Sequence, residues 1–540
     1  MISSIYELYN QFREISIFAA VTTILITSVA LLKHNAKKPV GKKLPGPRGL
    51  PLVGNLLQIP KERPWVKMAE WTKIYGPIYR LKLGFSNLVV LGSPKVAIEL
   101  LDRRSSKYSS RPRHIMTSEH VSRGLRMTFM PYGDLWKRER KLLHLLTQPK
   151  SAKLYEPIQS QESIQLCLDL IKSPENHWRH AQRYAGSTVL QITYSQRAIN
   201  SSDRSITEMR NCNDKMIQTA VPGRYWVDSI PILNYLPYYI CNWKKEASKI
   251  FEDSLNLFSN LYDSVAMNND DENLEKYDGS RIFGDCFVKR IEILKDQYGL
   301  SRDHAVFLAG AMFGAGSDTT AAAIETFIFA CATHPAKMIK AQEELDQTIG
   351  RDRLPQFSDQ RNLNYCNAMI RELLRWRTVI PGGLAHMTTE DDTYEGYYIP
   401  KGTSVVANHW SIHLDEETYE DPEQFKPERF IDSGTGALKG TPWSEAGHHA
   451  FGFGRRSCPG IHIAERSLYI TFSRILWAFE IIKYTDDDKS SMIDLNNFST
   501  GFSSSPLPFK VKILPRDESV IKLLEDEADC IGLDALNILF

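Results

Sequence analysis

The spacing of apolar residues changes along the chain, and each spacing predicts a different kind of secondary structure. From about residue 94 to residue 380, apolar positions recur mainly at the period of an α-helix. Prolines are expected to end helical segments there, at Pro157, Pro174, Pro222, Pro231, Pro237 and Pro335. Strand patterns are short and flank this region, at residues 78–83, 88–91, 397–399 and 403–407. The pattern predicts one α-rich domain with a small β region.

An uncharged, mostly apolar run covers residues 15–32. As an α-helix it would be roughly 27 Å long, close to the thickness of the bilayer core. Basic residues follow it, at Lys33, Lys37, Lys38, Lys42, Lys43 and Arg48. Because loops rich in lysine and arginine stay in the cytosol, we expect a short lumenal segment (1–14), a transmembrane anchor (15–32) and a cytosolic body. A cleaved signal peptide or a buried helix is the alternative.

The anchor is expected to continue into a linker and then into the main domain. Residues 33–55 are basic and then rich in proline and glycine, which predicts a stiff, non-helical connection. The main domain is expected over 56–516, with an exposed acidic loop near 268–280. In the tail, 517–540, acidic and apolar residues alternate, which is typical of an amphipathic helix, and we assign the tail no function.

Composition restricts the class of protein. Of the 540 residues 42% are hydrophobic and 24% charged, as in globular proteins, which excludes a mostly disordered chain. The net charge is +2, from 66 basic and 64 acidic residues, so no general field for nucleic acid exists and no nucleic-acid partner is expected. None of the 8 cysteines forms a C-x-x-C pair, which argues against a zinc ribbon or a disulfide framework. These properties indicate a large globular enzyme.

The stretch from Phe451 to Gly460 is the most informative segment. Its glycines permit close approach of the backbone to a flat ligand, and its two arginines are expected to lower the pKa of Cys458. A thiolate with no second cysteine nearby suits a single axial ligand better than a tetrahedral zinc site. The apolar pattern after Pro459-Gly460 predicts a helix whose positive end would also favour an anion.

The pattern F-x-x-G-x-R-x-C-x-G, carried by Phe451, Gly454, Arg456, Cys458 and Gly460, resembles the haem loop of the cytochromes P450. The resemblance implies the cytochrome P450 fold and haem b with Cys458 as its thiolate ligand. It also implies an endoplasmic reticulum membrane protein of the microsomal type. Electrons from NADPH would then arrive through a separate NADPH-cytochrome reductase, or additionally through cytochrome b5.

A second pattern lies in a helix expected from about Asp303 to Thr333, where Ala315 to Thr320 resembles the family's (A/G)-G-x-(D/E)-T-(T/S) motif. Glycines are poor helix residues, so Gly310, Gly314 and Gly316 are interpreted as making room for a flat ligand and a small gas molecule. Asp318 and Thr319 are the predicted catalytic pair, a carboxylate to relay protons beside a hydroxyl. A kinked buried helix with a back-bonded threonine is the alternative.

A third pattern, E-x-x-R, places Glu372 and Arg375 on one face of a helix. In the family a later arginine, here Arg429, binds this pair. Because buried charges are costly unless they satisfy one another, we expect the trio to be structural and to fix the loop that ends at Cys458.

A fourth pattern concerns the haem propionates. Trp136 and Arg140 are spaced i, i+4, so one helix face offers an indole N–H and a guanidinium as donors, and Arg456 is a third candidate. His386 stands where the family has a propionate-binding residue, although a satisfied loop histidine is the alternative. Four further basic residues, Lys137, Arg138, Lys141 and Arg455, are expected to form a basic patch. We expect this patch to bind an acidic electron donor; the alternative is that it is simply a solvent-exposed face.

By resemblance, the substrate pocket is expected to include the loop Arg113–Met130, residues 213–220, Phe313, residues 379–384 and residues 500–505. Their apolar character favours a hydrophobic small molecule. Residues 221–228 look like those of fungal members that oxidise secondary metabolites. The primary hypothesis is a monooxygenase, and the alternatives are a haem-thiolate isomerase or dehydratase that needs no external electrons and, outside the enzymes, a membrane-tethered haem or lipid carrier. The intact Asp318-Thr319 pair argues against the isomerase.

Overall fold

The computed structural model describes residues 41–84, 86–221, 223–266, 286–440, 447–484 and 494–533. The expected lumenal segment, the anchor at 15–32, residues 33–40 of the linker and the expected loop at 268–280 lie outside these residues. Within the part that is described, no helix is long and apolar enough to cross a membrane. The chain divides into two compact units.

The smaller unit includes residues 41–44 and 391–400. Strand β4 (Asp392–Tyr394) pairs with β5 (Tyr397–Ile399) in an antiparallel hairpin. Lys42 bridges to this hairpin, because its backbone N–H donates to the Gly396 carbonyl at 2.8 Å and its own carbonyl accepts from Tyr398 at 3.0 Å. The strand predicted at 397–399 is confirmed.

The larger unit spans Pro45–Glu390 and Lys401–Phe540. Its main sheet has the order β1-β2-β6-β3, formed by β1 (Ile78–Leu83), β2 (Ser86–Leu91), β6 (Ser404–Ala407) and β3 (His386–Met387). Strands β2 and β6 are parallel, with Val89 opposite Val405. A second pair, β7 (Phe479–Lys483) and β8 (Val511–Pro515), is antiparallel. The predicted strands at 78–83, 88–91 and 403–407 therefore exist, with shifts of at most two residues at their ends.

Helices form most of the larger unit, as predicted. The longer ones are α2 (Pro64–Tyr75), α5 (Asp134–Thr147), α7 (Glu156–Lys172), α8 (His177–Tyr194), α9 (Arg204–Thr219), α11 (Asn242–Ala266), α12 (Phe287–Leu294), α13 (Arg302–Thr333), α14 (Pro335–Thr348), α15 (Asn364–Trp376), α17 (Ile461–Ala478) and α18 (Glu518–Cys530). Shorter helices are α3 (Pro94–Ala97), α4 (Ser105–Tyr108), α6 (Pro149–Lys153), α10 (Trp226–Ser229) and α16 (His409–His413).

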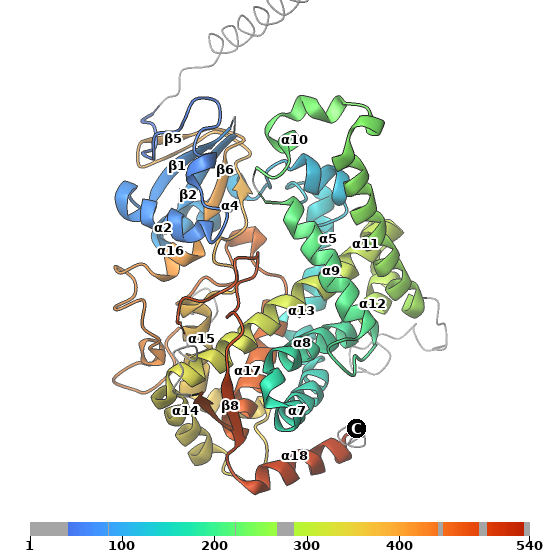
Figure 1. Cartoon of the computed structure of the whole chain (residues 1–540), viewed down its shortest axis with the longest axis vertical. Coiled ribbons are helices and arrows are strands. Elements are labelled where there is room, and N and C mark those ends of the chain that lie inside the picture. Colours follow the sequence, from blue (N-terminus) through green and yellow to red (C-terminus); the bar gives the residue numbers. More distant parts are fainter. Residues whose placement is uncertain are drawn as a thin grey trace, which may run out of the picture. The chain divides into compact units, whose positions relative to one another are not determined.

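Helix α13 runs through the middle of this unit and packs against α8, α11 and α17 (Figure 1). It begins after Ser301, whose hydroxyl caps the His304 N–H at 3.4 Å, and ends just before Pro335, as the sequence predicts. Its first half belongs to an apolar cluster shared with α5, α8, α11 and α12. Its second half belongs to a cluster shared with α7, α15 and α17. The helix therefore links the two cores of the unit.

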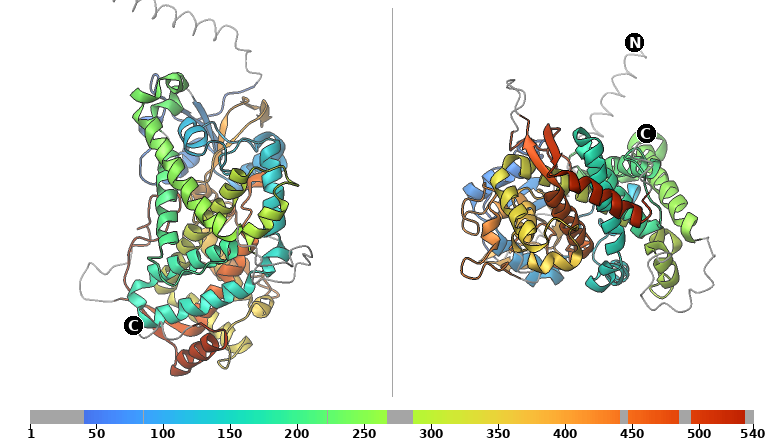
Figure 2. Two further views of the ribbon diagram at one scale, coloured as in Figure 1. Left: turned by 90° about the vertical axis from the view of Figure 1, so that its right-hand side faces the viewer. Right: turned by 90° about the horizontal axis from the view of Figure 1, so that it is seen from below.

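The predicted tail helix forms as α18 and packs against α7 (Figure 2). The Asp517 carboxylate caps it by accepting from the Val520 N–H at 3.2 Å. Val520, Leu524 and Ala528 are spaced at four residues and fully buried. The tail up to residue 533 is thus part of the folded unit.

Candidate active site

The cysteine loop is held by its own backbone and leads into α17. The Cys458 N–H donates to the Phe451 carbonyl at 2.8 Å, and the Ser457 N–H donates to Gly454 at 3.1 Å. Gly460 precedes the first residue of α17, so the predicted helix start is confirmed. The fold therefore presents the sulfur of Cys458 next to the N-terminus of a helix of eighteen residues.

Gly454 is required by packing within the protein. Its φ is +55°, and a Cβ at this position would lie 2.1 Å from the Leu101 carbonyl oxygen. Its N–H donates to the carboxylate of Asp102. At Gly460 a Cβ would lie 3.9 Å from the Cys458 sulfur, an ordinary contact. We interpreted the glycines of this loop as making room for a flat ligand. At Gly454 the close neighbour is instead the Leu101 carbonyl, so contact within the protein explains this glycine.

The pKa of Cys458 differs from the expectation. Burial raises the pKa of this thiol, while the Gly460 N–H and the Arg140 charge act in the opposite direction. We expected the two loop arginines to lower it, but the Arg456 guanidinium donates to backbone carbonyls. The protein alone favours the neutral thiol because the cost of desolvation exceeds these interactions, and a bound metal ion would deprotonate it.

The predicted propionate donors do come together around the buried Trp136, with Arg140 and Arg456 half-buried beside it. The Arg456 guanidinium lies 4.2 Å from the Trp136 ring centroid and donates to the carbonyls of Ser109 and Met130, both at 2.7 Å. Arg140 donates to the Ser457 carbonyl at 2.7 Å. Among the described residues, the Trp136 indole N–H, 4% exposed by residue, has no hydrogen-bond acceptor.

Arg111 belongs to the same cluster, and sequence reasoning missed it. It donates to the carbonyls of Leu384 and Ala385, at 3.1 and 2.7 Å. Burial lowers the pKa of Arg111 to about 10, so it stays charged at neutral pH. In the sequence Arg111 looks like many surface arginines, so no local pattern indicates that it is buried beside the other cluster arginines.

This cluster of Arg111, Arg140 and Arg456 hydrogen-bonds to main-chain carbonyls, and none of its bonds within the described residues goes to a carboxylate. Buried cations are costly without an anion nearby. The donors therefore fit a buried dianion, such as the two propionates of the expected haem.

His386 has a different character from the arginines. Its Nδ1 lies 2.8 Å from the Tyr108 carbonyl, and because a carbonyl only accepts, Nδ1 must carry the proton. Burial, with the charges of Arg111 and Arg456, lowers the pKa of His386 to about 3. The neutral ring then presents Nε2 as an acceptor, so His386 can donate to a propionate only after protonation.

The three glycines of α13 have a reason that we did not predict. A Cβ at Gly310 would lie 2.5 Å from the Phe258 ring, one at Gly314 would lie 2.8 Å from Asn213, and one at Gly316 would lie 2.6 Å from Val189. These neighbours belong to α11, α9 and α8. The glycines therefore allow close helix packing, which corrects the interpretation that they admit a ligand. Ala315 is nevertheless exposed, between the buried Gly314 and the half-buried Gly316.

Asp318 and Thr319 point in different directions. The Asp318 carboxylate accepts from the Asn213 amide at 3.1 Å, and burial raises the pKa of Asp318, against the Asn213 hydrogen bond. The Thr319 hydroxyl donates to the Ala315 carbonyl at 2.8 Å. Successive helical residues are about 100° apart, so Asp318 faces α9 while Thr319 lies on the side of Ala315. The predicted pair is not in direct contact, and the back-bonded threonine that we named as the alternative is present.

Glu325 is a second carboxyl group that sequence reasoning missed. It lies two turns beyond Asp318 on the same face of α13 and is 8% exposed. Burial raises the pKa of Glu325 to about 8, while the Arg210 charge and a Ser505 hydrogen bond oppose this. Arg210 also faces Asp318. The sequence did contain a signal for Glu325: beyond the first turn of α13, Asp318 and Glu325 are the charged residues, and they are spaced i, i+7.

The expected structural trio is assembled and buried. Glu372 and Arg375 are both fully buried, with Nε to Oε2 at 2.7 Å and Nη2 to Oε1 at 2.8 Å. The Arg429 Nε donates to the same carboxylate at 2.9 Å, and the Lys426 N–H donates to it at 2.7 Å. Every oxygen of Glu372 is therefore satisfied.

Three buried histidines, His409, His413 and His448, and the half-buried His449 lie between this trio and the cysteine loop. Burial lowers the pKa of His409 and His449 to about 4 and that of His448 to about 3. Within the described residues, no group of three or more histidine, cysteine and acidic side chains could hold a metal ion. These residues are neutral packing groups.

The basic patch is exposed. Arg138 donates to the Gly299 carbonyl at 2.9 Å, Lys137 pairs with Asp134 at 3.1 Å, and Arg455 donates to the Tyr132 hydroxyl. Arg138 and Lys141 also line a shallow groove of about 380 Å³ with residues 296–299. These contacts leave both interpretations of the patch open.

Hydrogen bonds join the predicted pocket segments. The Thr117 and Thr219 hydroxyls lie 3.0 Å apart, which connects the loop Arg113–Met130 to α9. Asn213 donates to the Gly314 carbonyl at 3.0 Å, which connects α9 to α13. The Ser504 N–H donates to the Val379 carbonyl at 2.8 Å. These hydrogen bonds bring the predicted pocket segments, which are far apart in sequence, next to one another.

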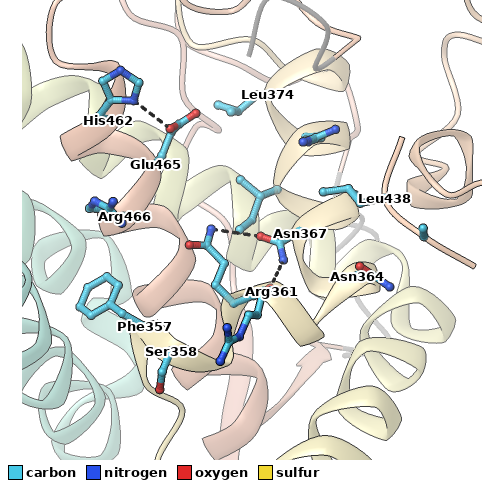
Figure 3. Close-up of a pocket in the computed structure, with 14 residues that line it drawn as sticks. Phe357, Ser358, Arg361, Asn364, Asn367, Leu374, Leu438, His462, Glu465 and Arg466 are labelled. Carbon is cyan, nitrogen blue, oxygen red and sulfur yellow. Dashed lines mark hydrogen bonds and ion pairs between the residues drawn. The ribbon is translucent and has the colours of Figure 1, made fainter. Parts of the chain in front are cut away.

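A separate groove of about 830 Å³ lies between α15 and α17 (Figure 3). Asn367 and Leu374 line it from α15, and His462 and Glu465 from α17, where their side chains are 3.6 Å apart. None of its lining residues belongs to the predicted pocket segments. This groove is therefore not the expected substrate pocket.

The family model for cytochrome P450 matches residues 44–513 of the chain. Cytochrome P450 monooxygenase 58 of Postia placenta is 35% identical over 508 residues, which cover 94% of each protein. The monooxygenase ARMGADRAFT_1018418 of Armillaria gallica is 36% identical over 513 residues (94% of this chain and 97% of the relative). The monooxygenase drtD of Aspergillus calidoustus is 37% identical over 475 residues (88% and 86%). The matched range contains every residue of the candidate site.

Proposed function

Because the chain belongs to the cytochrome P450 monooxygenases, we propose that it is a membrane-anchored fungal member that inserts one oxygen atom of O2 into a hydrophobic secondary metabolite. Enzymes of this family carry a haem with a cysteine thiolate ligand and receive electrons from a redox partner, and Cys458 is that cysteine. One observation carries the proposal: a thiol lies beside a cluster of one buried and two half-buried arginines that has no carboxylate partner in the described structure.

Residues of the chain hold the cofactor in this proposal. The haem supplies O2 binding and the activation of oxygen when it is bound. Arg111, Arg140 and Arg456 neutralise its propionates, and the Trp136 indole N–H donates to one of them. The Phe451–Gly460 loop holds the sulfur, and Gly460 donates its N–H to it. Each of these groups lacks a carboxylate partner of its own in the described structure.

Proton delivery is assigned to Asp318 and Thr319. Burial raises the pKa of Asp318, which makes this carboxyl group a better proton carrier than an exposed aspartate. The Thr319 hydroxyl keeps its lone pairs available, because its own proton is donated to Ala315. Since the two side chains are not in contact, a water molecule is needed to carry the proton between them. Glu325, on the same helix face as Asp318, is suited to pass protons inward.

The proposed cellular setting is based on the sequence. The apolar run at 15–32 and the lysines after it support a single-pass anchor in the endoplasmic reticulum with a cytosolic catalytic domain. The partner is NADPH-cytochrome reductase, with cytochrome b5 as an additional donor. The exposed cations Lys137, Arg138 and Arg455 support docking of an acidic partner. The fungal relatives and the residues 221–228 support a role in secondary metabolism.

Co-expression with a fungal reductase tests this function. Extracts of cells that carry the chain, the reductase and NADPH should gain products that are one oxygen atom heavier or two hydrogen atoms lighter than host metabolites. Incubation under 18O2 should label the oxygenated products. Turnover that persists without reductase and NADPH would instead indicate an isomerase or dehydratase and contradict the proposal.

A further inference from the structure

Arg126 is a buried cation with few partners. The residue is 5% exposed and lies in the segment between residues 121 and 134. Its Nη2 donates to the Ser254 hydroxyl of α11 at 3.0 Å. Its guanidinium carbon lies 5.2 Å from the ring centroid of Phe258 and 5.4 Å from that of Phe307. Its Nε is buried without an acceptor among the described residues.

Three other buried arginines are better satisfied. Arg183 pairs with Glu162 and with Asp169, the latter at 2.7 Å. Arg375 pairs with Glu372. Arg474 has no such pair, yet it makes four hydrogen bonds to carbonyls and hydroxyls. Arg126 has one hydrogen bond, to a hydroxyl, and within the described structure it has no carboxylate partner and no acceptor for its buried Nε.

Arg126 stays charged in this environment. Burial lowers the pKa of Arg126 to about 10, which leaves the guanidinium protonated at neutral pH. The one titratable group that acts on it electrostatically is the Cys212 thiol, whose own pKa is raised by burial. A permanent cation in an apolar wall gains free energy from any anion that reaches it.

The position of Arg126 relates it to both the cofactor side and the substrate side. The next residue, Met127, gives its carbonyl to Arg456 of the propionate cluster at 3.2 Å. The Arg126 side chain contacts α11 and α13 instead. Leu125 and Met127 pack against the apolar cluster that contains Met312 and Phe313. Arg126 therefore projects from the predicted pocket loop into the wall formed by α11 and the first half of α13.

We propose that Arg126 determines substrate specificity by binding a carboxylate, or an equivalent anionic oxygen, of an otherwise apolar substrate. This inference rests on the proposed function, because it assigns the substrate class of the same enzyme. Phe307 precedes Thr319 by twelve positions on α13, roughly 18 Å along the helix axis. If Arg126 holds the carboxylate of the substrate, the carbon that is oxidised should lie far from that carboxylate.

The specificity proposal is tested by titrating dodecanoate and, separately, dodecan-1-ol into the purified holoenzyme. The two probes have alkyl chains of the same length and differ in whether the end is a carboxylate or an alcohol. Binding is followed by the change in haem absorbance, at a pH where dodecanoate is ionised. In the wild type, dodecanoate should bind at least about tenfold more tightly than the alcohol. Arg126→Gln should abolish that preference while leaving the affinity for the alcohol within about threefold. The Arg204→Gln variant, which changes an exposed arginine on α9, should behave as the wild type.

The outcomes separate the two proposals. If Arg126→Gln folds poorly, Arg126→Lys keeps the charge and should retain the preference for the acid at reduced magnitude. The inference is overturned if the wild type does not prefer dodecanoate over dodecan-1-ol. It is also overturned if Arg126→Gln keeps that preference or if Arg126→Lys loses it. Failure of the proposed function would look different, since the wild-type preparation would then lack the haem-thiolate spectrum altogether.

Discussion

The backbone N–H of His449 donates a 2.9 Å hydrogen bond to Nε2 of His413. The His413 carbonyl in turn accepts from Arg375 at 2.7 Å, and the His449 carbonyl accepts from the Gly452 N–H at 3.0 Å. These bonds form a continuous connection from the Glu372–Arg375–Arg429 trio to the loop that carries Cys458. The trio therefore positions the cysteine loop through a histidine that is neutral because it is buried.

Replacing Glu372 by alanine is expected to prevent haem loading. The change leaves Arg375, which is fully buried, without its counter-ion, and such a loss costs about 3–5 kcal/mol. Haem content per protein, measured after expression with excess haem precursor, should fall to a small fraction of the wild-type value. Glu70→Ala, which removes an exposed ion pair with Lys67, serves as control. A normally loaded Glu372→Ala protein would show that the trio does not act on the loop.

Glu139 gives a prediction about pH. It is fully buried on α5, neither carboxylate oxygen has a hydrogen-bond partner in the described structure, and burial raises the pKa of Glu139 to about 8. The folded state then holds a proton that the unfolded state releases above its ordinary pKa near 4.5. The free energy of unfolding therefore falls as pH rises between about 4.5 and about 8, by about 3 kcal/mol at pH 7.

The Glu139→Gln variant removes this titration. Its melting temperature should exceed that of the wild type at pH 8, and the difference should shrink towards pH 5. Calorimetry of both proteins across this range measures the effect. A difference that stays constant with pH, or grows as the pH falls, would mean that Glu139 is ionised in the folded protein.

Thr319→Ala is expected to uncouple NADPH consumption from product formation. The haem should load normally, because the hydrogen bond of the Thr319 hydroxyl in the described structure goes to Ala315 and not to the propionate cluster. Product per NADPH should fall by at least about tenfold, and peroxide should accumulate. Thr333→Ala removes the same type of back-bond, to Phe329 at 2.8 Å, farther along the helix and serves as control. Unchanged coupling in Thr319→Ala would remove this hydroxyl from proton delivery.

The tail helix is expected to contribute to stability. Leu524 on α18 is fully buried, so Leu524→Ala should lower the free energy of unfolding by about 2–5 kcal/mol. The exposed neighbour Lys522, changed to alanine, should shift it by less than about 0.5 kcal/mol. Thermal unfolding of the two variants measures both values. Equal melting temperatures would indicate that α18 does not pack on the domain in solution.

Sequence reasoning succeeded where a local pattern fixes local structure. The period of apolar residues located α13, the start of α17 and the strands, and the i, i+3 spacing located Glu372 and Arg375. It failed where the reason for a residue lies in a distant segment. Gly310 is a glycine because of Phe258, and Gly454 because of Leu101. Arg111 has no local pattern, since carbonyls more than 250 positions away define its role.

The pKa of Cys458 illustrates a second limit. Neighbouring arginines in sequence suggested a lowered value, but side-chain direction decides which charges act on the sulfur. Arg456 contacts the Trp136 ring and Arg140 acts on the thiol from α5. Burial, which depends on the whole fold, outweighs both.

The most direct test of the account is the absorbance spectrum of the purified chain, reduced and exposed to carbon monoxide. Thiolate ligation by Cys458 predicts the strongly red-shifted Soret band of a haem with an anionic sulfur ligand, and Cys458→His should lose that band while retaining bound haem. A well-folded wild-type protein that binds no haem, or one whose red-shifted band survives in Cys458→His, would contradict it.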